Sequence, residues 1–397
     1  MEWKEVDICQ LCDSVSETYK GNASEVVLIN TSDVLDGKCL NHEYVPNKKL
    51  KGQFKKTFRK GDILYSEIRP ANKRFCFVDF EPKDYIASTK LMVLRAHEDV
   101  DPQYLYQILR SNDTLTQLQM LAESRSGTFP QITYSELSNI MVSLPSQKAQ
   151  KNIVSILASL DRKIELNNKI NADLEEMAQA IFKNWFVEFE PFKDGKFVDS
   201  ELGMIPEGWK VGTLTEIASY INGLAMQKFP PENNEDSLPV LKIKELGQGF
   251  CGTDSDRCSC NIKDECKIHN GDVIFSWSGT LLVDVWCGGD CGLNQHLFKV
   301  TSKDYPKWFY YYWTKHHLQE FIHIAKDKAV TMGHIKRGHL EAALVAIPDD
   351  DSMEKANELF EPILSKFISL RLENSRLSLL RDTLLPRLMS GEIEVPE

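Results

Sequence analysis

The chain has 397 residues, of which 42% are hydrophobic and 26% are charged, and its formal net charge is −11. This composition is typical of a folded protein of two or three domains and excludes a disordered chain, and no window approaches the roughly 18 consecutive apolar residues of a membrane span. The N-terminal residues lack a basic head followed by an apolar core, so we expect no secretory signal, and we expect the ten cysteines to be reduced thiols in a cytoplasm.

Residues 1–145 are predicted to form an α/β domain. A helical pattern covers residues 102–122. Runs of β-branched and aromatic residues predict strands near residues 62–68, 75–80, 91–94 and 140–144. Near the start of this domain, Cys9 and Cys12 are expected in a helix, where core packing explains the pair better than metal binding.

Residues 146–190 are predicted to form a long spacer helix. Its apolar stripe alternates gaps of four and three residues, which is a heptad pattern rather than the 3.6-residue period of a helix lying on a globular domain. The stripe consists of Ile153, Leu157, Leu160, Ile164, Asn167, Asn171, Leu174, Ala178, Ile181 and Trp185. A turn-rich linker at residues 187–200 is expected to lead into the next domain.

Residues 191–349 are predicted to form the linker and a second α/β domain, and residues 350–397 a second spacer helix. A helical stretch is expected at residues 306–325, between strands near residues 273–277, 297–300 and 344–347. We expect Pro362 to bend the last helix or to delay its beginning, and Pro386 to weaken its end. The stripe of this helix is Phe360, Ile363, Phe367, Leu370, Asn374, Leu377, Arg381, Leu384 and Leu388.

The two halves of the chain match each other as a diverged tandem repeat. Trp3-Lys4 matches Trp209-Lys210, and the GDIL of residues 61–64 matches the GDVI of residues 271–274. From the loop after the first helical stretch onward, the difference in residue number between matching positions stays constant across some 60 residues. Leu144-Pro145, for example, aligns with Ile347-Pro348. A repeat of this length predicts that the two halves share the same arrangement of strands and helices.

The two long helices are expected to pair antiparallel as a coiled coil. A seam of about 35 residues is roughly 50 Å long, which only a partner of equal length covers fully. An alternative is that each helix is amphipathic and lies on its own domain. Buried amides in the seam would fix its register. The expected interface consists of Ile153, Leu157, Leu160, Ile164, Leu174, Ile181, Ile363, Phe367, Leu370, Leu377 and Leu384.

An antiparallel pair of related helices would relate the two domains by a pseudo-twofold axis. Dimeric DNA-binding proteins use true twofold symmetry to recognise inverted half-sites at a fixed spacing. A single chain with two unequal halves is therefore predicted to read two different half-sites of double-stranded DNA, separated by a gap that the helix pair sets.

Candidate DNA contacts in the first domain lie in a basic stretch and in one loop. Residues 48–74 carry ten basic side chains against two acidic ones, which can give a positive face to an acidic protein. Alternative interpretations are a solvated basic loop and a plain connection between helix and strand. The candidates here are Lys55, Lys56, Arg59, Arg69, Lys73, Arg74, Arg125, Thr128 and Gln131.

The second domain offers an equivalent loop and two further polar groups. Both copies of the loop keep a cation followed three residues later by threonine, which suits phosphate contact, while Asn and Gln suit adenine edges in the major groove. The agreement between copies could instead preserve packing. The candidates here are Ser278, Thr280, Asn294, Gln295, His296, Lys328, Thr331, His334, Lys336 and Arg337.

The chain resembles the specificity subunit of type I restriction-modification systems over its whole length. The resemblance rests on the repeat and on five stretches in order, which are GDILYSEIR at 61–69, GTFPQIT at 127–133, INADLEEMAQAIFKNWF at 170–186, ELGMIPEGWK at 201–210 and ENSRLSLLRDTLLPRLMSGEI at 373–393. It implies two target-recognition domains that each read one half of a bipartite DNA site. It also implies paired spacer helices that hold two adenine-N6 methyltransferase (modification) subunits, which restriction subunits that act as ATP-driven translocases would join.

We expect no catalytic residue, metal or cofactor in this chain. It lacks a G-x-x-x-x-G-K-[ST] phosphate loop, a methyl-donor loop, the Asn-Pro-Pro-aromatic signature of adenine methyltransferases, and G-x-S-x-G and H-E-x-x-H. The cysteines of residues 251–291 do not have the spacing of a structural zinc site. Two rival hypotheses stay open. One is a coiled-coil adaptor with two domains that bind ligands other than DNA, and the other is a metal enzyme that uses the cysteines of residues 251–291 together with His269.

Overall fold

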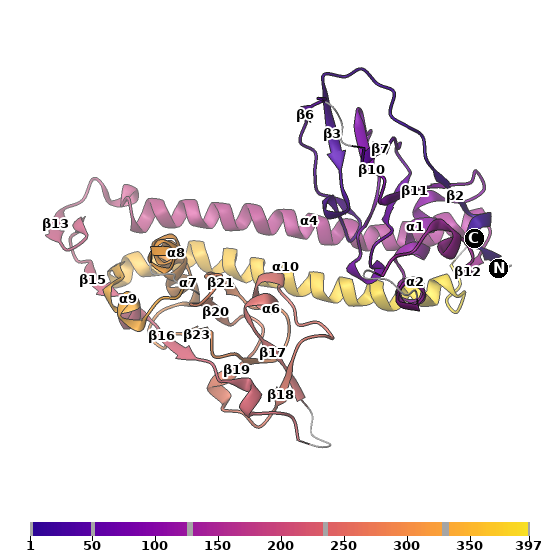
Figure 1. Ribbon diagram of the computed structural model, residues 1–397. Helices are drawn as coiled ribbons and strands as arrows, with labels where there is room; N and C mark the ends of the chain where they lie inside the picture. The colour runs from indigo at the N-terminus through magenta and orange to yellow at the C-terminus, as the bar shows by residue number, and fades with distance from the viewer. Residues whose placement is uncertain (1–2, 49–51, 125–129, 233–236, 328–332, 396–397) are drawn as a thin grey trace. The chain divides into compact units, whose positions relative to one another are not determined.

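The computed structural model describes residues 3–48, 52–124, 130–232, 237–327 and 333–395 (Figure 1). The chain divides into two compact units. Unit 1 comprises Met1–Arg162 and Leu377–Glu397, and unit 2 comprises Lys163–Arg376. Each unit therefore contains one globular part together with a segment of each long helix.

Unit 1 is built on two four-stranded sheets. The first sheet is antiparallel throughout and has the order β2 (Cys12–Val15), β11 (Leu91–Ala96), β8 (Ile63–Ser66), β9 (Phe75–Phe77). The second has the order β6 (Val45–Pro46), β3 (Glu25–Ile29), β10 (Tyr85–Ser88), β7 (Phe54–Lys56), with β3 and β10 parallel. Unit 1 also contains two separate antiparallel strand pairs. They are β1 (Lys4–Asp7) with β12 (Met141–Leu144) and β4 (Val34–Leu35) with β5 (Lys38–Cys39).

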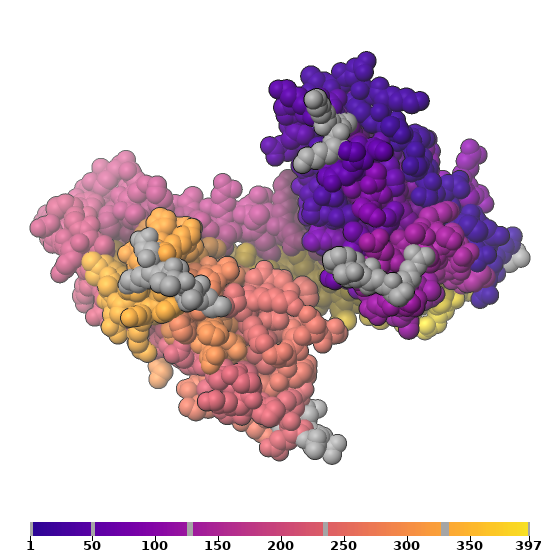
Figure 2. All heavy atoms as spheres, viewed as in Figure 1, coloured from indigo at the N-terminus to yellow at the C-terminus, as the bar shows by residue number. Residues whose placement is uncertain are grey.

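The helices of unit 1 cover the first sheet through one apolar core. They are α1 (Pro102–Arg110), α2 (Asn112–Ser124) and α3 (Tyr134–Ser138). Helix α1 begins where it does because the Asp101 carboxylate accepts hydrogen bonds from the backbone N–H groups of Gln103 and Tyr104. Tyr104 is fully buried and belongs to the core that the strands and helices share. In Figure 2 the atoms of the N-terminal part of this unit, coloured indigo to purple, form one continuous lobe.

Unit 2 repeats the two sheets of unit 1 strand for strand. Its antiparallel sheet has the order β16 (Ser219–Asn222), β23 (Leu297–Thr301), β20 (Val273–Ser276), β21 (Leu282–Val285). Its second sheet has the order β18 (Arg257–Ser259), β17 (Ser237–Leu241), β22 (Cys291–Leu293), β19 (Lys267–Ile268), again with one parallel pair, β17 and β22. Strand β15 (Lys210–Thr213) pairs with β24 (Leu344–Ile347) as β1 does with β12. This shared topology confirms the predicted duplication.

The remaining elements of unit 2 are helices and one hairpin. The helices are α5 (Leu214–Ile217), α6 (Ile243–Gln248), α7 (Lys307–His316), α8 (Leu318–Asp327) and α9 (Arg337–Ala342). The hairpin joins β13 (Phe197–Ser200) to β14 (Gly203–Pro206). Part of the segment expected to be only linker is therefore a strand.

The two long helices, α4 (Gln147–Phe186) and α10 (Asp350–Met389), have 40 residues each. Within unit 2, the Asn167 amide donates to Asn374 Oδ1 at 2.9 Å, while the rings of Phe182 and Phe360 lie 6.3 Å apart. Moving forward along α4 thus means moving backward along α10. Within unit 1, Asp161 of α4 pairs with Arg381 of α10 at 2.8 Å. The predicted antiparallel pairing is confirmed, and Figure 1 traces it in unit 2.

The structure corrects two expectations about local structure, the delay of α10 by Pro362 and the shared helix of Cys9 and Cys12, while a bend at Pro362 stays a prediction. Helix α10 is not delayed by Pro362, because Asp349 caps its N-terminus by accepting a hydrogen bond from the Ser352 N–H at 2.8 Å. Pro362 and Glu358 are both exposed, so the carbonyl that loses its donor is on the solvent side. Cys9 and Cys12 do not share a helix, since a short 3-10 turn ends at Gln10 and Cys12 opens β2.

Candidate nucleic-acid interface

In each unit, two of the segments predicted to contact DNA are joined backbone to backbone. In unit 1, Ile68 bridges Gln131, and the Arg69 N–H donates to the Pro130 carbonyl at 3.1 Å. In unit 2, Ser278 bridges His334, and the Gly279 N–H donates to the Gly333 carbonyl at 2.9 Å. The same bonds therefore recur at repeat-related positions, and we call each joined pair of segments a loop junction.

The basic residues beside the unit 1 junction sit on a tightly turned backbone. Arg69 and Lys73 flank a 3-10 turn at Pro70–Asn72, with φ values of 45° and 51° that residues with a Cβ rarely adopt. Both side chains are exposed. Arg74 is more constrained, because its guanidinium donates to the carbonyls of Ser32 at 3.1 Å and Val34 at 3.4 Å. The turn thus presents two cations beside Gln131.

The rest of the basic stretch divides into exposed and internal groups. Lys55 and Arg59 are exposed. The Lys56 ammonium instead donates to the carbonyls of Leu91 at 2.8 Å and Thr89 at 3.3 Å, and desolvation by burial lowers the pKa of Lys56. These bonds hold Lys56 against the connection from β10 to β11, so we leave it out of the proposed DNA contacts.

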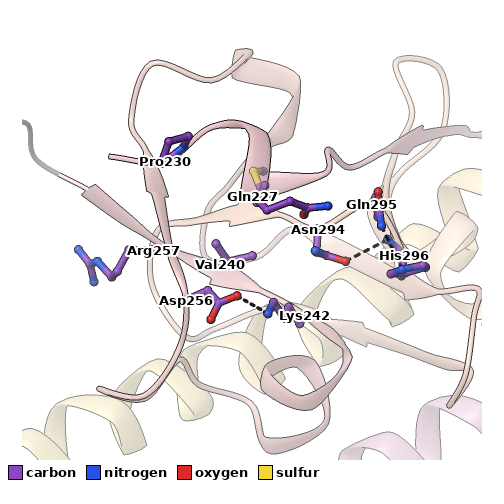
Figure 3. A pocket seen from close by; sticks show the side chains of 10 residues that line it. Gln227, Pro230, Val240, Lys242, Asp256, Arg257, Asn294, Gln295 and His296 are labelled. Atoms are coloured by element: carbon purple, nitrogen blue, oxygen red, sulfur yellow. Dashed lines mark hydrogen bonds and ion pairs between the residues drawn. The ribbon is translucent and has the colours of Figure 1, made fainter. Parts of the chain in front are cut away.

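A pocket of about 440 Å³ lies on unit 2 and collects three of the predicted residues (Figure 3). Asn294, Gln295 and His296 form one wall, at the turn between β22 and β23. The other lining residues, which the sequence analysis did not single out, are Met226, Gln227, Pro230, Val240, Lys242, Asp256 and Arg257. They come from three separate segments, and no local pattern in the sequence marked them.

A close backbone approach fixes the walls of this pocket relative to each other. The Leu224 N–H donates to the Leu293 carbonyl at 2.9 Å, and the Gly223 N–H donates to the Leu297 carbonyl at 3.1 Å. A Cβ at Gly223 would lie 2.2 Å from the Asn294 carbonyl oxygen, a distance that only glycine avoids. The segment carrying Gln227 is therefore held directly against the turn carrying Gln295.

The other predicted residues of unit 2 differ in how far their side chains are exposed to solvent. Thr280, His334, Lys336 and Arg337 are exposed. Ser278 is only 5% exposed, which corrects its prediction as a direct DNA contact, because it lies in the strand-like bridge of the junction. Asn294 is 8% exposed and its Oδ1 accepts from the His296 N–H at 3.3 Å, so it shapes the turn. The predicted contacts Arg125, Thr128, Lys328 and Thr331 lie outside the described residues.

The residues of the predicted helix interface lie on α4 and α10 and differ in burial. Ile153, Leu157 and Leu370 are buried, and the other eight members are half-buried. Asn167 is fully buried, and its amide donates to Glu373 at 2.8 Å as well as to Asn374. The polar layer expected in the seam therefore consists of paired amides and a carboxylate.

The described part of the chain shows neither a metal-binding cluster nor a helix suited to a membrane span. No group of three or more His, Cys, Asp or Glu side chains there is arranged to hold a metal ion. Among the same residues, no helix combines the length and apolar character needed to cross a membrane.

Loss of the Arg69 side chain is expected to weaken DNA binding by a similar factor for every DNA sequence. A phosphate contact carries no base information, so Arg69→Ala should also reduce the slope of log affinity against log salt by about 1. Affinity measured against salt on the chain assembled with its partners tests this. Lys83→Ala, which removes an exposed cation of the same unit away from the junction, is the control. An unchanged salt slope would remove Arg69 from the interface.

Comparison with known proteins places this geometry in a family. The model of the type I restriction modification DNA specificity domain matches twice, at residues 2–176 and 206–380. The HindI specificity subunit of a type I restriction enzyme from Haemophilus influenzae is 30% identical over 99% of this chain and 100% of that protein. The MjaIX specificity subunit from Methanocaldococcus jannaschii is 28% identical over 90% of this chain and 85% of that protein.

A solved structure shares the fold. The crystal structure of the type I restriction-modification S subunit from M. genitalium has a TM-score of 0.54 and 14% identity, covering 100% of this chain and 97% of that one. None of these comparisons supports an adaptor with heads for other ligands. With two matches to one domain model, a full-length relative and two topologically identical sheet pairs, the chain belongs to the type I restriction-modification DNA specificity family.

Proposed function

We propose that this protein is the DNA sequence-recognition subunit of a type I restriction-modification complex. Each unit would bind one half of a bipartite, gapped site in double-stranded DNA. The observation that carries the proposal is the loop junction, which the chain builds twice with the same backbone bonds and with polar or cationic side chains at both copies. Because the side chains differ between copies, the two half-sites would differ in sequence.

The contribution of this chain to the reaction would be geometric. It would hold two modification subunits over one adenine in each half-site, and those subunits would take the adenine out of the base stack to methylate N6. Restriction subunits would join this core and supply translocation and cleavage. We assign no catalytic residue and no cofactor to this chain. The complex would assemble in a cytoplasm, where the ten cysteines would be kept reduced.

The paired helices would set the gap between half-sites. An antiparallel seam of apolar side chains with a buried amide layer resists sliding, since a shift in register would bury Asn167 without its partners. The domain boundaries that follow from this function are a first recognition domain at 1–145, a spacer at 146–190, a linker and second recognition domain at 191–349, and a second spacer at 350–397.

Expression with a modification subunit in a host without other adenine methylation is expected to produce one methylated motif. Genome-wide mapping of N6-methyladenine should show two short, unequal half-sites separated by a gap of fixed length. The modification subunit expressed without this chain is the control and should leave the motif unmethylated. A continuous, ungapped motif, or no motif that depends on this chain, would contradict the proposed function.

A further inference from the structure

Two carboxamide side chains face the pocket of unit 2 from segments about 70 residues apart in the sequence. Gln227 belongs to a 3-10 turn at Met226–Lys228, and Gln295 belongs to the turn between β22 and β23. Figure 3 shows the Gln227 side chain pointing toward Asn294 and Gln295. The glycine at position 223 and the backbone bonds beside it hold these two segments together, so the carboxamides are placed before any ligand binds.

Most other polar groups of the pocket are already engaged. Lys242 forms an ion pair with Asp256, and the Arg257 guanidinium donates to Ser237 Oγ at 2.8 Å. Asn294 stabilises its own turn. These groups shape the wall and its charge, but their hydrogen-bonding capacity is partly used within unit 2.

Gln227 and Gln295 keep the capacity to bind a ligand. Gln227 is exposed and makes no side-chain hydrogen bond to a described residue. Gln295 is half-exposed, and its Nε2 approaches only the His296 ring nitrogen Nε2, at 3.3 Å. His296 in turn lies against Trp277, with ring centroids 5.9 Å apart, which limits its movement. The free donors and acceptors therefore converge at one side of the pocket.

The carboxamide of a glutamine matches the edge of adenine in the major groove. A carboxamide donates to N7 and accepts from the N6 amino group of adenine at the same time, and no other base offers that pattern there. We propose that Gln227 and Gln295 read an A·T base pair in the half-site that unit 2 binds, with Gln295 contacting adenine. This inference rests on the proposed function and adds the residues and the base of one recognition contact.

The test compares methylated motifs made by complexes containing single variants. Gln227→Ala and Gln295→Ala are each expected to relax one A·T position in one half-site by about 10-fold in discrimination, because a bidentate base contact contributes about 1–3 kcal/mol. Gln295→Glu should shift that position toward cytosine, whose N4 amino group donates to a carboxylate. The other half-site and the gap should not change. Gln248→Ala, which removes an exposed carboxamide of α6 in the same unit outside the pocket, should leave the whole motif intact.

The outcomes separate this inference from the proposed function. If the wild-type complex makes no gapped motif, the proposed function fails. If the wild-type complex makes such a motif and both alanine variants and Gln295→Glu make the identical one, the Gln227 and Gln295 assignment is overturned. Uniform weakening of both half-sites would also overturn it, because that pattern belongs to a phosphate contact or to lost stability. Thermal unfolding of each assembled variant, compared with Gln248→Ala, reports that loss of stability directly.

Discussion

Replacing Phe360 with alanine is expected to lower the free energy of unfolding by about 3–5 kcal/mol, the cost typical of removing a buried aromatic side chain. Phe360 is fully buried on α10 and stacks on Trp308 of α7, with ring centroids 4.5 Å apart at 13°. Its ring also lies 6.1 Å from that of Phe186 on α4. One side chain therefore joins α4 and α10 to α7 within unit 2.

Urea unfolding followed by Trp fluorescence measures this change, since Trp308 lies at the site. The neighbouring Leu359→Ala is a matched control, because Leu359 is 41% exposed on the same helix and its loss should cost much less. Similar losses of unfolding free energy for the two variants would mean that the aromatic cluster does not hold α10 to the rest of unit 2. In that case the attachment of this spacer segment would need another explanation.

Lengthening both long helices by one heptad is expected to abolish methylation of the native motif and to leave only motifs with a longer gap. Seven residues add about 10.5 Å to a helix and keep the apolar seam on the same face. Facing insertion points are after Arg162 in α4 and after Ser378 in α10, as the nearby Asp161–Arg381 pair indicates. Mapping N6-methyladenine in the host gives the gap directly, and both half-site sequences should stay the same.

An insertion outside the helices is the control that distinguishes the effect of helix length from the general effect of inserting seven residues. The same seven residues placed after Asp194, in the exposed turn before β13, should leave the gap unchanged. If the heptad insertions leave the native gap as it was, the helices do not set the spacing of the half-sites. The recognition contacts of the two units would still stand, because they lie on the sheets and loops rather than on the seam.

The duplication was predicted from matching residues at a nearly constant shift, and the long helices and their antiparallel seam were predicted from the spacing of their apolar residues. These features depend on periodicity, because an apolar residue every three or four positions selects one face of a helix whatever the surrounding structure. Strands β8, β9 and β11 of unit 1 and β20 and β23 of unit 2 were also predicted, because runs such as Ile63–Ser66 and Val273–Ser276 are continuous and apolar. Strands β2, β16 and β21 of the same sheets were not predicted. The resemblance to a known family came from motifs spread along this same pattern.

The second sheet of each unit and the composition of the pocket could not be predicted from the sequence, because both depend on contacts between distant segments. Strands such as Lys267–Ile268 are two residues long, too short for any periodicity to mark them. Lys56 is part of a basic run in the sequence, yet its ammonium is satisfied by strand carbonyls. Gln227 lines the same pocket as Gln295 because Gly223 allows two distant backbone segments to approach closely. Contacts between distant segments depend on which surfaces pack together, and local sequence does not encode that choice.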